Sequence, residues 1–581
     1  MKADLKNVSR RTFVAATALG LAGCASSSDD DSGSTTGSAE ASSDSSSTTD
    51  SDTSVLRINI GGEPDYLDPG LISSSDCSML STQSFVGLYG YDENSDLYAT
   101  LADGDPEVSE DGLTYTVKIK ESQWSDGTEL TANDFLYSWN RVVDDATAAD
   151  YEYLFDVVAR NDDGTVAVTA DDDYTLTITL TNPCPYFTQL MAMITYFPVP
   201  EDEVEAADPD GTNPGAWCQE AGYKCNGAFK LDAWSHDESM TYVKNEYFYD
   251  ADNVSLESLE YMLSEDDTAT FAAYQSGDLD FADTIPTDEL ASVMEDEDFH
   301  KIPSQGTYYV AFNVNSDFFE GMTRDEAAQF RKAICLFIDR QYIVDTVCQC
   351  GQQVADSFIC PGMSDGNGNE FKTDDVSYYD PSEEALADNQ AEGREILEGL
   401  GYTFTDNGDG SYTCEPSITI PYILNEGSLH EGVAECIQQD LATMGITMSV
   451  ELQDWNVLLE NRKNGNYTFT REGWITDYDD PINYLELFTS DSGNNDPQFG
   501  VDPEEWAPEW DEYDEMIDEI RTMTDYEARA EKCHEAEDYL MATWAVIPIY
   551  YYNDVYLQKT NVDGIYAKFD AGKYFMYATK S

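Results

Sequence analysis

Basic residues are scarce in this chain. Only 29 lysines and arginines stand against 115 aspartates and glutamates, and the formal net charge is −86. A field of this sign repels nucleic acid and anionic membrane surfaces, so we expect no nucleic-acid partner and no electrostatic membrane binding. The same field favours solubility and cationic solutes, but it does not specify a fold.

Patterns of metal ligands are also missing. The chain has four histidines, no HExxH pair and no paired CxxC units at zinc spacing, so we expect neither a metal site nor a cofactor. Eleven of the 12 cysteines follow Cys24, and an odd number cannot pair completely within the chain. Cys218 and Cys225 are close enough in sequence for a local disulfide, whereas Cys348 and Cys350 are too close for an unstrained one.

A hydrophobic run long enough to anchor the mature chain is absent from the N-terminus. The apolar stretch from Phe13 to Ala22 is too short to span a bilayer. It follows Arg10 and Arg11, which resemble a twin-arginine export signal, and it leads into "LAGC", which resembles the lipobox of bacterial lipoproteins. We therefore expect residues 1–24 to be an export signal ending at Cys24, and Cys24 to be acylated as the lipid attachment point.

Residues 25–53 contain only Ala, Ser, Thr, Gly, Asp and Glu, so they lack the apolar side chains that a core requires. We expect a disordered tether with a root-mean-square reach of roughly 30 Å. The chain as a whole is 41% hydrophobic and 12% aromatic over 581 residues. That is ample material for several folded domains after the tether.

Strand and helix signals alternate from Val55 onward, which indicates an α/β fold. We expect strands at 55–61, 112–120 and 175–180, and helices at 129–142 and 325–347. A βαβ unit follows: a strand at 418–424, a helix with apolar residues every fourth position from Leu429 to Leu441, a break at Gly445 and a strand at 446–452. Ligands of such units lie where the strand ends and the helix begins, which is the position of His430.

Several long stretches resemble one family, the dipeptide- and oligopeptide-binding proteins of bacterial ABC importers. The likeness covers about 55–581. Its most specific part is "ATLADGDPEVSEDGLTYTVKIKESQWSDGTELTANDFLYSW", and the other matching segments are "GGEPDYLDPGL", "NGAFKLDAWSHDESMTYVKNEYFYD", "GTYYVAFNVNSDFF", "FRKAICLFIDR" and "IPIYYYND".

The resemblance implies a bilobed clamshell of three α/β domains, of the large periplasmic-binding-protein type, with the ligand enclosed between the lobes. It divides the chain into domain I (54–85, 193–305 and 554–581), domain II (86–192) and domain III, the second lobe (306–553). It implies a monomer that binds peptides, is held at the membrane by its lipid, faces the extracellular or periplasmic side, and delivers its ligand to the permease subunits of an ABC transporter. It implies no enzymatic activity.

The segment "REGWITDYDDP" (471–481) resembles the strand and turn that receive the peptide in this family. Asp477 falls where the family places the aspartate that binds the peptide's α-ammonium group, and Gly473 and Trp474 fall on the strand that pairs with the peptide backbone by a buried form of β-augmentation. The resemblance assigns a second set of backbone contacts to Ser73, Ser74 and Ser75.

Three basic residues match those that bind the peptide's C-terminal carboxylate in this family. These are Arg462, Arg471 and His430, and surface ion pairing is the alternative for both arginines. Three aromatic residues match the linings of side-chain pockets: Trp455, Tyr309 and Tyr552. One departure is visible, because Ile475 and Gly306 replace two cysteines that form a disulfide in some relatives.

Rival functions remain open at this point. "GMSDG" (Gly362–Gly366) fits the GxSxG pattern of serine hydrolases, but Pro361 before it and the Gly/Asn-rich stretch after it predict a loop instead of the required strand–turn–helix. The same clamshell binds nickel complexes, haem or oligosaccharides in other relatives. A surface receptor that senses peptides without feeding an importer is a third alternative.

Overall fold

A computed structural model describes residues 53–287, 289–373, 376–425, 428–453 and 455–581, without the side chains of 428, 455 and 456. The expected export signal, Cys24 and nearly all of the expected tether lie outside the described residues. The described helices include none that is both long and apolar enough to cross a membrane.

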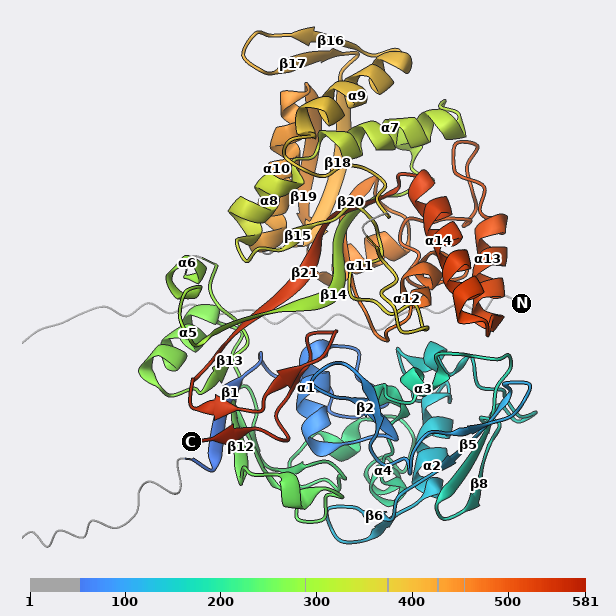
Figure 1. The fold of residues 1–581 in the computed structure, drawn as a ribbon, viewed down its shortest axis with the longest axis vertical. Coiled ribbons are helices and arrows are strands. Elements are labelled where there is room, and N and C mark those ends of the chain that lie inside the picture. The colour runs from blue at the N-terminus through green and yellow to red at the C-terminus, as the bar shows by residue number, and fades with distance from the viewer. Residues whose placement is uncertain (1–52, 288, 374–375, 426–427, 454) are drawn as a thin grey trace, which may run out of the picture. The chain divides into compact units, whose positions relative to one another are not determined.

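An 11-stranded mixed sheet organises the fold (Figure 1). Its strands, in spatial order, are β10 (Phe229–Ser235), β11 (Ser239–Lys244), β12 (Ser258–Met262), β1 (Val55–Asn59), β13 (Phe281–Ala282), β21 (Val546–Gln558), β14 (Phe299–Phe312), β20 (Phe469–Ile475), β18 (Ile418–Asn425) and β19 (Ile446–Gln453), with β15 (Gln353–Val354) beside β21. The two longest strands, β14 and β21, run antiparallel side by side in the middle of the sheet.

Smaller sheets surround this one. A four-stranded sheet consists of β4 (Glu107–Val108), β5 (Thr114–Lys118), β9 (Thr175–Thr179) and β8 (Val168–Asp172). Two-stranded sheets pair β2 (Tyr89–Tyr91) with β3 (Leu97–Ala99), β6 (Ser122–Gln123) with β7 (Glu129–Leu130), β16 (Thr403–Asp406) with β17 (Tyr412–Glu415), β22 (Val562–Asp563) with β25 (Thr579–Lys580), and β23 (Tyr566–Ala567) with β24 (Lys573–Tyr574).

The longer helices pack around these sheets. They are α1 (Ser75–Ser84), α2 (Ala132–Val142), α5 (Asp267–Ser276), α7 (Arg324–Phe337), α9 (Leu386–Gly399), α10 (Ser428–Thr443), α11 (Trp455–Lys463), α13 (Asp511–Thr522) and α14 (Tyr526–Ala542). The short ones are α3 (Phe187–Leu190), α4 (Glu201–Ala207), α6 (Leu290–Val293), α8 (Arg340–Ile343) and α12 (Ile482–Leu485).

The expected βαβ unit is confirmed. Strands β18 and β19 are parallel in register from Ile418↔Ile446 to Asn425↔Gln453, and α10 connects them. The helix buries Val433, Ile437 and Leu441 against the sheet, as the fourfold spacing predicted. Gly445 follows the helix with φ +73°, a conformation that favours glycine.

The single helix expected at 325–347 is wrong. Helix α7 ends at Phe337, because Ile338 is extended with φ −80° and ψ 123°. Asp339 then caps a new helix, α8, by accepting a hydrogen bond from the Tyr342 amide. The chain continues as a π-helical turn at Val344–Cys348. The apolar periodicity continued across this break and concealed it.

The local disulfide suggested for Cys218 and Cys225 is also wrong. All eleven cysteines of the described residues are free thiols, and ten of them are buried. The Cys218 thiol donates a weak hydrogen bond to the Gly215 carbonyl, and the Cys225 thiol donates one to the Phe229 carbonyl. Both therefore act as small buried hydrophobic residues.

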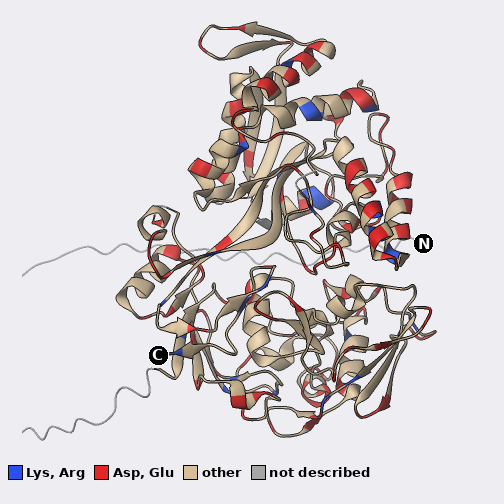
Figure 2. Cartoon of the chain, viewed as in Figure 1, with Lys and Arg blue, Asp and Glu red and all other residues tan. Residues whose placement is uncertain are grey.

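The sheet around β14 separates two parts of the core. Tyr308, Val310 and Phe312 belong to a cluster with the buried side chains of α7 and α10. Tyr309 and Ala311, which alternate with them, belong to a second cluster that contains the residues of α12. We call these two sides of the sheet the α10 face and the α12 face. Acidic residues are spread over helices and loops throughout the molecule, and basic ones are few (Figure 2).

Candidate functional site

Strand β20 has an unpaired edge. It pairs with β14 along its whole length, from Phe312↔Phe469 to Gly306↔Ile475. On its other side it pairs with β18 only at Phe469 and Thr470. In the part of the chain that the structure describes, the second edge from Gly473 to Ile475 therefore pairs with no strand. Such an edge is a template for an added strand.

The side chains of this edge alternate between the two faces. Gly473 is opposite Tyr308, so Arg471 and Gly473 belong to the α10 face. Glu472 is opposite Tyr309, so Glu472 and Trp474 belong to the α12 face. The departure noted in the sequence is consistent with this register, because Gly306 and Ile475 are direct partners.

Asp477 follows the end of β20, and only neutral donors surround its carboxylate. The Tyr151 hydroxyl lies 3.3 Å from Oδ1, the Tyr153 hydroxyl 3.4 Å from Oδ2, and the Asn483 amide nitrogen 3.3 Å from Oδ2. The Asn483 oxygen accepts in turn from the Asp477 amide and from the Trp474 indole, both at 3.0 Å. No cationic side chain of the described residues forms an ion pair with Asp477.

Electrostatics set Asp477 apart from its neighbour Asp480. Burial raises the pKa of Asp477 to about 6, and the nearby carboxylates of Asp570 and Glu486 add to the rise. Asp480, only three residues later, is held by both guanidinium nitrogens of Arg529 at 2.7 and 2.8 Å. Asp480 is thus a buried ion pair of the scaffold, whereas Asp477 is a carboxylate without a counter-ion among the described residues.

The α10 face brings four of the expected site residues together: Arg471, Gly473, His430 and Tyr552. His430 lies on the first turn of α10, with Nδ1 3.4 Å from the Tyr308 hydroxyl and its ring stacked on that tyrosine. Arg471 donates from Nε to the Asn425 side chain at 2.8 Å. Burial lowers the pKa of His430 to about 4, and the positive charge of Arg471 contributes. The imidazole is therefore neutral at pH 7.

Tyr552 covers the glycines of this face. A Cβ atom at Gly473 would lie 2.4 Å from the Tyr552 hydroxyl oxygen, and one at Gly306 would lie 2.5 Å from its ring. The ring itself makes an edge-on contact with Tyr308 at 6.3 Å. Glycine is thus required here by close packing of an aromatic ring on the strand, since neither position has a positive φ.

Arg462 lies on the α12 face, across the sheet from Arg471. It forms ion pairs with Glu472 at 2.8 Å and with Asp496 at 2.7 Å, and all three side chains are nearly buried. Burial raises the pKa of Glu472, and Asp496 raises it further while Arg462 opposes the rise. The ion-pair alternative for Arg462 therefore matches the geometry, although the pair is buried and not on the surface.

The remaining expected residues are dispersed. Tyr309 is buried on the α12 face against the ring of Phe358. Ser73, Ser74 and Ser75 are exposed at the start of α1, where Ser74 is the N-cap residue. Among the described residues, no hydrogen bond joins these serines to β20. Trp455 begins α11, but its side chain lies outside the described residues.

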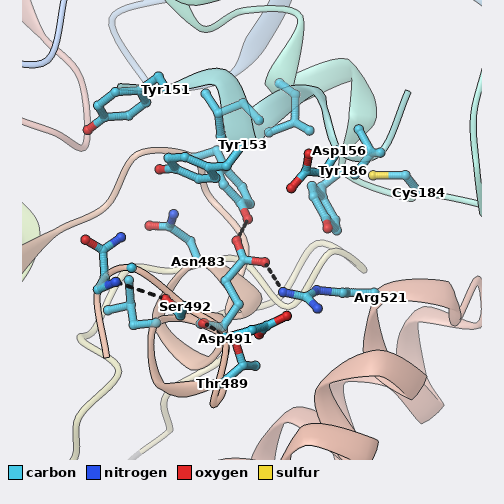
Figure 3. A pocket seen from close by; sticks show the side chains of 18 of the residues that line it. Tyr151, Tyr153, Asp156, Cys184, Tyr186, Asn483, Thr489, Asp491, Ser492 and Arg521 are labelled. Carbon is cyan, nitrogen blue, oxygen red and sulfur yellow. Dashed lines mark hydrogen bonds and ion pairs between the residues drawn. The ribbon is translucent and has the colours of Figure 1, made fainter. Parts of the chain in front are cut away.

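A cavity of about 740 Å³ adjoins Asp477 (Figure 3). Tyr151, Tyr153, Trp474 and Asn483 line it. Three of these residues also contact the Asp477 carboxylate, and none of the three was predicted. The tyrosines are more than 300 positions away from Asp477 in the chain and belong to no motif, so only the tertiary structure reveals them.

Comparison with known proteins decides the family. The model of the bacterial extracellular solute-binding proteins, family 5 (middle region), matches residues 96–496. The chain is a family 5 solute-binding protein. It is 31% identical to the oligopeptide-binding protein OppA of Bacillus subtilis over 538 residues, which covers 88% of this chain and 90% of that relative.

Solved structures agree with this assignment. The solute-binding protein superposes on Haemophilus influenzae OppA in complex with RPPGFSPFR with a TM-score of 0.73 and 26% identity, covering 91% of this chain and 99% of the other. Listeria monocytogenes OppA bound to peptide gives a TM-score of 0.71 at 26% identity, with coverage of 91% and 99%. The expected α/β periplasmic-binding-protein fold is thereby confirmed.

Family 5 proteins bind solutes and are not enzymes, and the local structure at "GMSDG" agrees. Ser364 forms an isolated bridge with Glu370, its hydroxyl accepts from the Gly366 amide, and its own amide donates to Asp479. No helix begins in the described residues that follow it, 365–373, so the nucleophile elbow of a hydrolase is not formed. Among the described residues no group of three or more potential metal ligands comes together.

Proposed function

We propose that this solute-binding protein captures peptides outside the cell by pairing with the backbone at the free edge of β20 and by binding the charged peptide ends, and that it delivers them to an ABC transporter permease. One observation carries the proposal. At the end of that edge, Asp477 is a partly buried carboxylate that three neutral donors surround and that no described cation neutralises. The α-ammonium group of a peptide supplies the missing charge.

The position of Asp477 also suggests the direction and length of the peptide. With its ammonium group at Asp477, the peptide runs antiparallel to β20 towards Arg471. Six strand residues of about 3.3 Å separate these two positions, which is about 20 Å. An arginine side chain covers several ångströms of that span, so roughly four or five peptide residues fit between the two charges.

The α10 face provides groups for the peptide's carboxylate. Arg471 supplies a guanidinium group, and neutral His430 donates from whichever ring nitrogen carries its proton. Arg462 is a poorer candidate because two buried carboxylates already hold it. Backbone pairing reads no side chains, which suits a broad peptide importer.

Relatives support the peptide as ligand. The Bacillus subtilis relative is named an oligopeptide-binding protein, and the Haemophilus influenzae and Listeria monocytogenes proteins were solved with peptides.

For cellular location, the "LAGC" sequence supports attachment through an acylated Cys24 on the outer side of the cell membrane. We also propose the division into domains I, II and III at the boundaries given above.

Mass spectrometry of molecules that copurify with the protein tests the ligand class directly. We expect short peptides; a nickel complex, haem or an oligosaccharide in their place would refute the proposal. Calorimetry with alanine peptides of two to six residues, each with free or blocked ends, then tests end recognition.

Cys24→Ala should abolish labelling of the protein by a radioactive fatty acid, and labelling at the wild-type level would refute the lipid anchor.

A further inference from the structure

Residues 184–190, which we call the Pro185 arm, connect the proposed domain II to the turn that follows Asp477 in the proposed domain III. The Tyr526 hydroxyl donates to the Pro185 carbonyl at 3.2 Å, and the Gln189 side-chain amide donates to the Asp479 carbonyl at 3.1 Å. The partners are 341 and 290 positions apart in the chain. The arm therefore ties the turn of Asp477 to the opposite lobe.

Tyr186 lies at the centre of this contact. Its ring stacks on Tyr478 with the ring centroids 5.2 Å apart, and the Arg529 guanidinium lies 5.4 Å from the same ring. The side chain is only 4% exposed. Its hydroxyl is hydrogen-bonded to the Cys184 thiol within the arm, so the ring alone makes the contact with domain III. Such a ring stabilises the contact by packing, by stacking and by cation–π attraction.

The arm is held firmly on its own side. Phe187 is fully buried and makes an edge-on contact with Tyr115 at 5.0 Å. The Tyr115 hydroxyl donates to the Cys184 carbonyl at 3.0 Å. Pro183 and Pro185, on either side of Cys184, each fix a backbone φ angle. The arm is therefore expected to move with domain II as one body.

The receiving surface in domain III is fixed by its own contacts. The Tyr478 hydroxyl donates to Glu486 at 2.5 Å. Arg529 donates to both carboxylate oxygens of Asp480, at 2.7 and 2.8 Å. Two surfaces that are already ordered lose little conformational freedom when they meet. The contact can therefore form and break as a unit when the lobes move.

We propose that the Pro185 arm is a latch that holds the two lobes closed and thereby positions Tyr151 and Tyr153 on the Asp477 carboxylate. The inference rests on the proposed function, because it requires lobes that close on a peptide. The latch contacts the turn after Asp477 and favours the closed form whether or not a peptide is bound. Apparent affinity depends on how readily the closed form is reached, so a weaker latch lowers the affinity for every peptide by the same factor.

Two substitutions each remove one part of the latch. Tyr526→Phe deletes only the hydroxyl that donates to Pro185, and we expect calorimetry to show roughly 2- to 10-fold weaker peptide binding. Tyr186→Ala deletes the buried ring, and we expect about 10- to 100-fold weaker binding. Tyr186→Phe is the conservative variant. It keeps the ring and loses only the hydroxyl that bonds Cys184 within the arm, so it should bind peptides as the wild type does.

Tyr539→Phe is the matched control for Tyr526→Phe. Both tyrosines are on α14, and the Tyr539 hydroxyl also donates to a backbone carbonyl, that of Glu509, at 3.1 Å. Glu509 belongs to the same proposed lobe, so this variant should keep the wild-type affinity. Urea denaturation of the unliganded proteins measures any general loss of stability separately. Stopped-flow measurement should show faster peptide dissociation from the latch variants and an unchanged rate for the control.

Tri-alanine, tetra-alanine and N-acetylated tetra-alanine separate the latch from recognition of the peptide ends. We expect each latch variant to weaken all three by one factor, in contrast to Asp477→Asn. A loss confined to peptides with a free N-terminus, wild-type affinity in the latch variants, or an equal loss in Tyr539→Phe overturns the latch and leaves end recognition by the wild type intact.

Failure of every peptide with free ends to bind the wild type overturns the proposed function, and the latch with it. Tyr526→Phe removes a single hydroxyl from a partly buried side chain. It therefore decides the question even where Tyr186→Ala does not fold.

Discussion

Asp477→Asn should have opposite effects on affinity and on stability. The substitution keeps the size of the side chain and removes its charge. If Asp477 binds the peptide's ammonium group in a site away from bulk water, loss of one partner costs about 2–5 kcal/mol. That corresponds to a loss of affinity of roughly thirty- to several-thousand-fold. Peptides with an acetylated N-terminus lack the ammonium group and should bind the wild type and the variant equally weakly.

The stability of the unliganded protein should increase in the same variant. The pKa of Asp477 is raised from the usual 3.8 to about 6. The folded state therefore binds more protons than the unfolded state between these values, and ionisation destabilises the fold as the pH rises through this window. The full penalty is present above pH 6 and is at most about 3 kcal/mol. Asn carries no charge, so the free energy of unfolding should rise by about 1–2 kcal/mol at pH 7 and change little at pH 4.

Two measurements decide between this account and a structural role. Calorimetry with free and acetylated peptides on both proteins gives the coupling energy between Asp477 and the ammonium group. Urea denaturation at pH 7 and pH 4 gives the change in stability. A coupling energy near zero, together with a variant less stable than the wild type at pH 7, would show that Asp477 serves only to hold its turn.

Other substitutions test the strand, the buried cluster and the α10 face. Gly473→Ala should reduce peptide affinity at least tenfold by displacing Tyr552 while the protein still folds. Gly399→Ala is the control and should leave the affinity unchanged, because a Cβ there meets nothing within 4 Å. Equal peptide affinities of the Gly473→Ala variant and the wild type would refute this role for the strand. Arg462→Met should destabilise the protein by about 3–5 kcal/mol in urea denaturation, because it leaves two buried carboxylates without their cation; a selective loss of peptides with free C-termini would instead support the carboxylate role. His430 should titrate near pH 4 by NMR without ligand and at higher pH with a peptide that has a free carboxylate, and an unchanged titration would place the carboxylate elsewhere.

The sequence predicted the βαβ unit well because its apolar residues follow the periods of strand and helix without interruption. The expected helix at 325–347 shows where hydrophobic periodicity fails as a predictor. The apolar stripe continues through Ile338, and only the capping side chain of Asp339 and its tertiary contact with Asp440 end the helix. Periodicity records which face is buried; it does not record where the backbone changes direction.

The sequence could place some residues of the site and not others. Asp477 and Trp474 lie within a contiguous motif, so a family resemblance could place them. The pairing of Arg462 with Glu472 and Asp496 brings together residues up to 34 positions apart, and no local pattern marks it. Tyr151 and Tyr153 come from a segment without any motif. Contacts of this kind depend on how the whole chain folds, and one sequence by itself does not reveal them.

The free thiols of this protein make its opening measurable without any engineered label. Ten of the eleven described cysteines are buried, and only Cys436 is partly accessible. A thiol reagent added to the native protein should modify Cys436 quickly, and the other ten only as fast as the surrounding structure opens. Because the buried thiols are distributed from Cys77 to Cys533, mass spectrometry of the modified peptides would rank the segments by how often they open. The same experiment with bound peptide would show which segments the ligand closes.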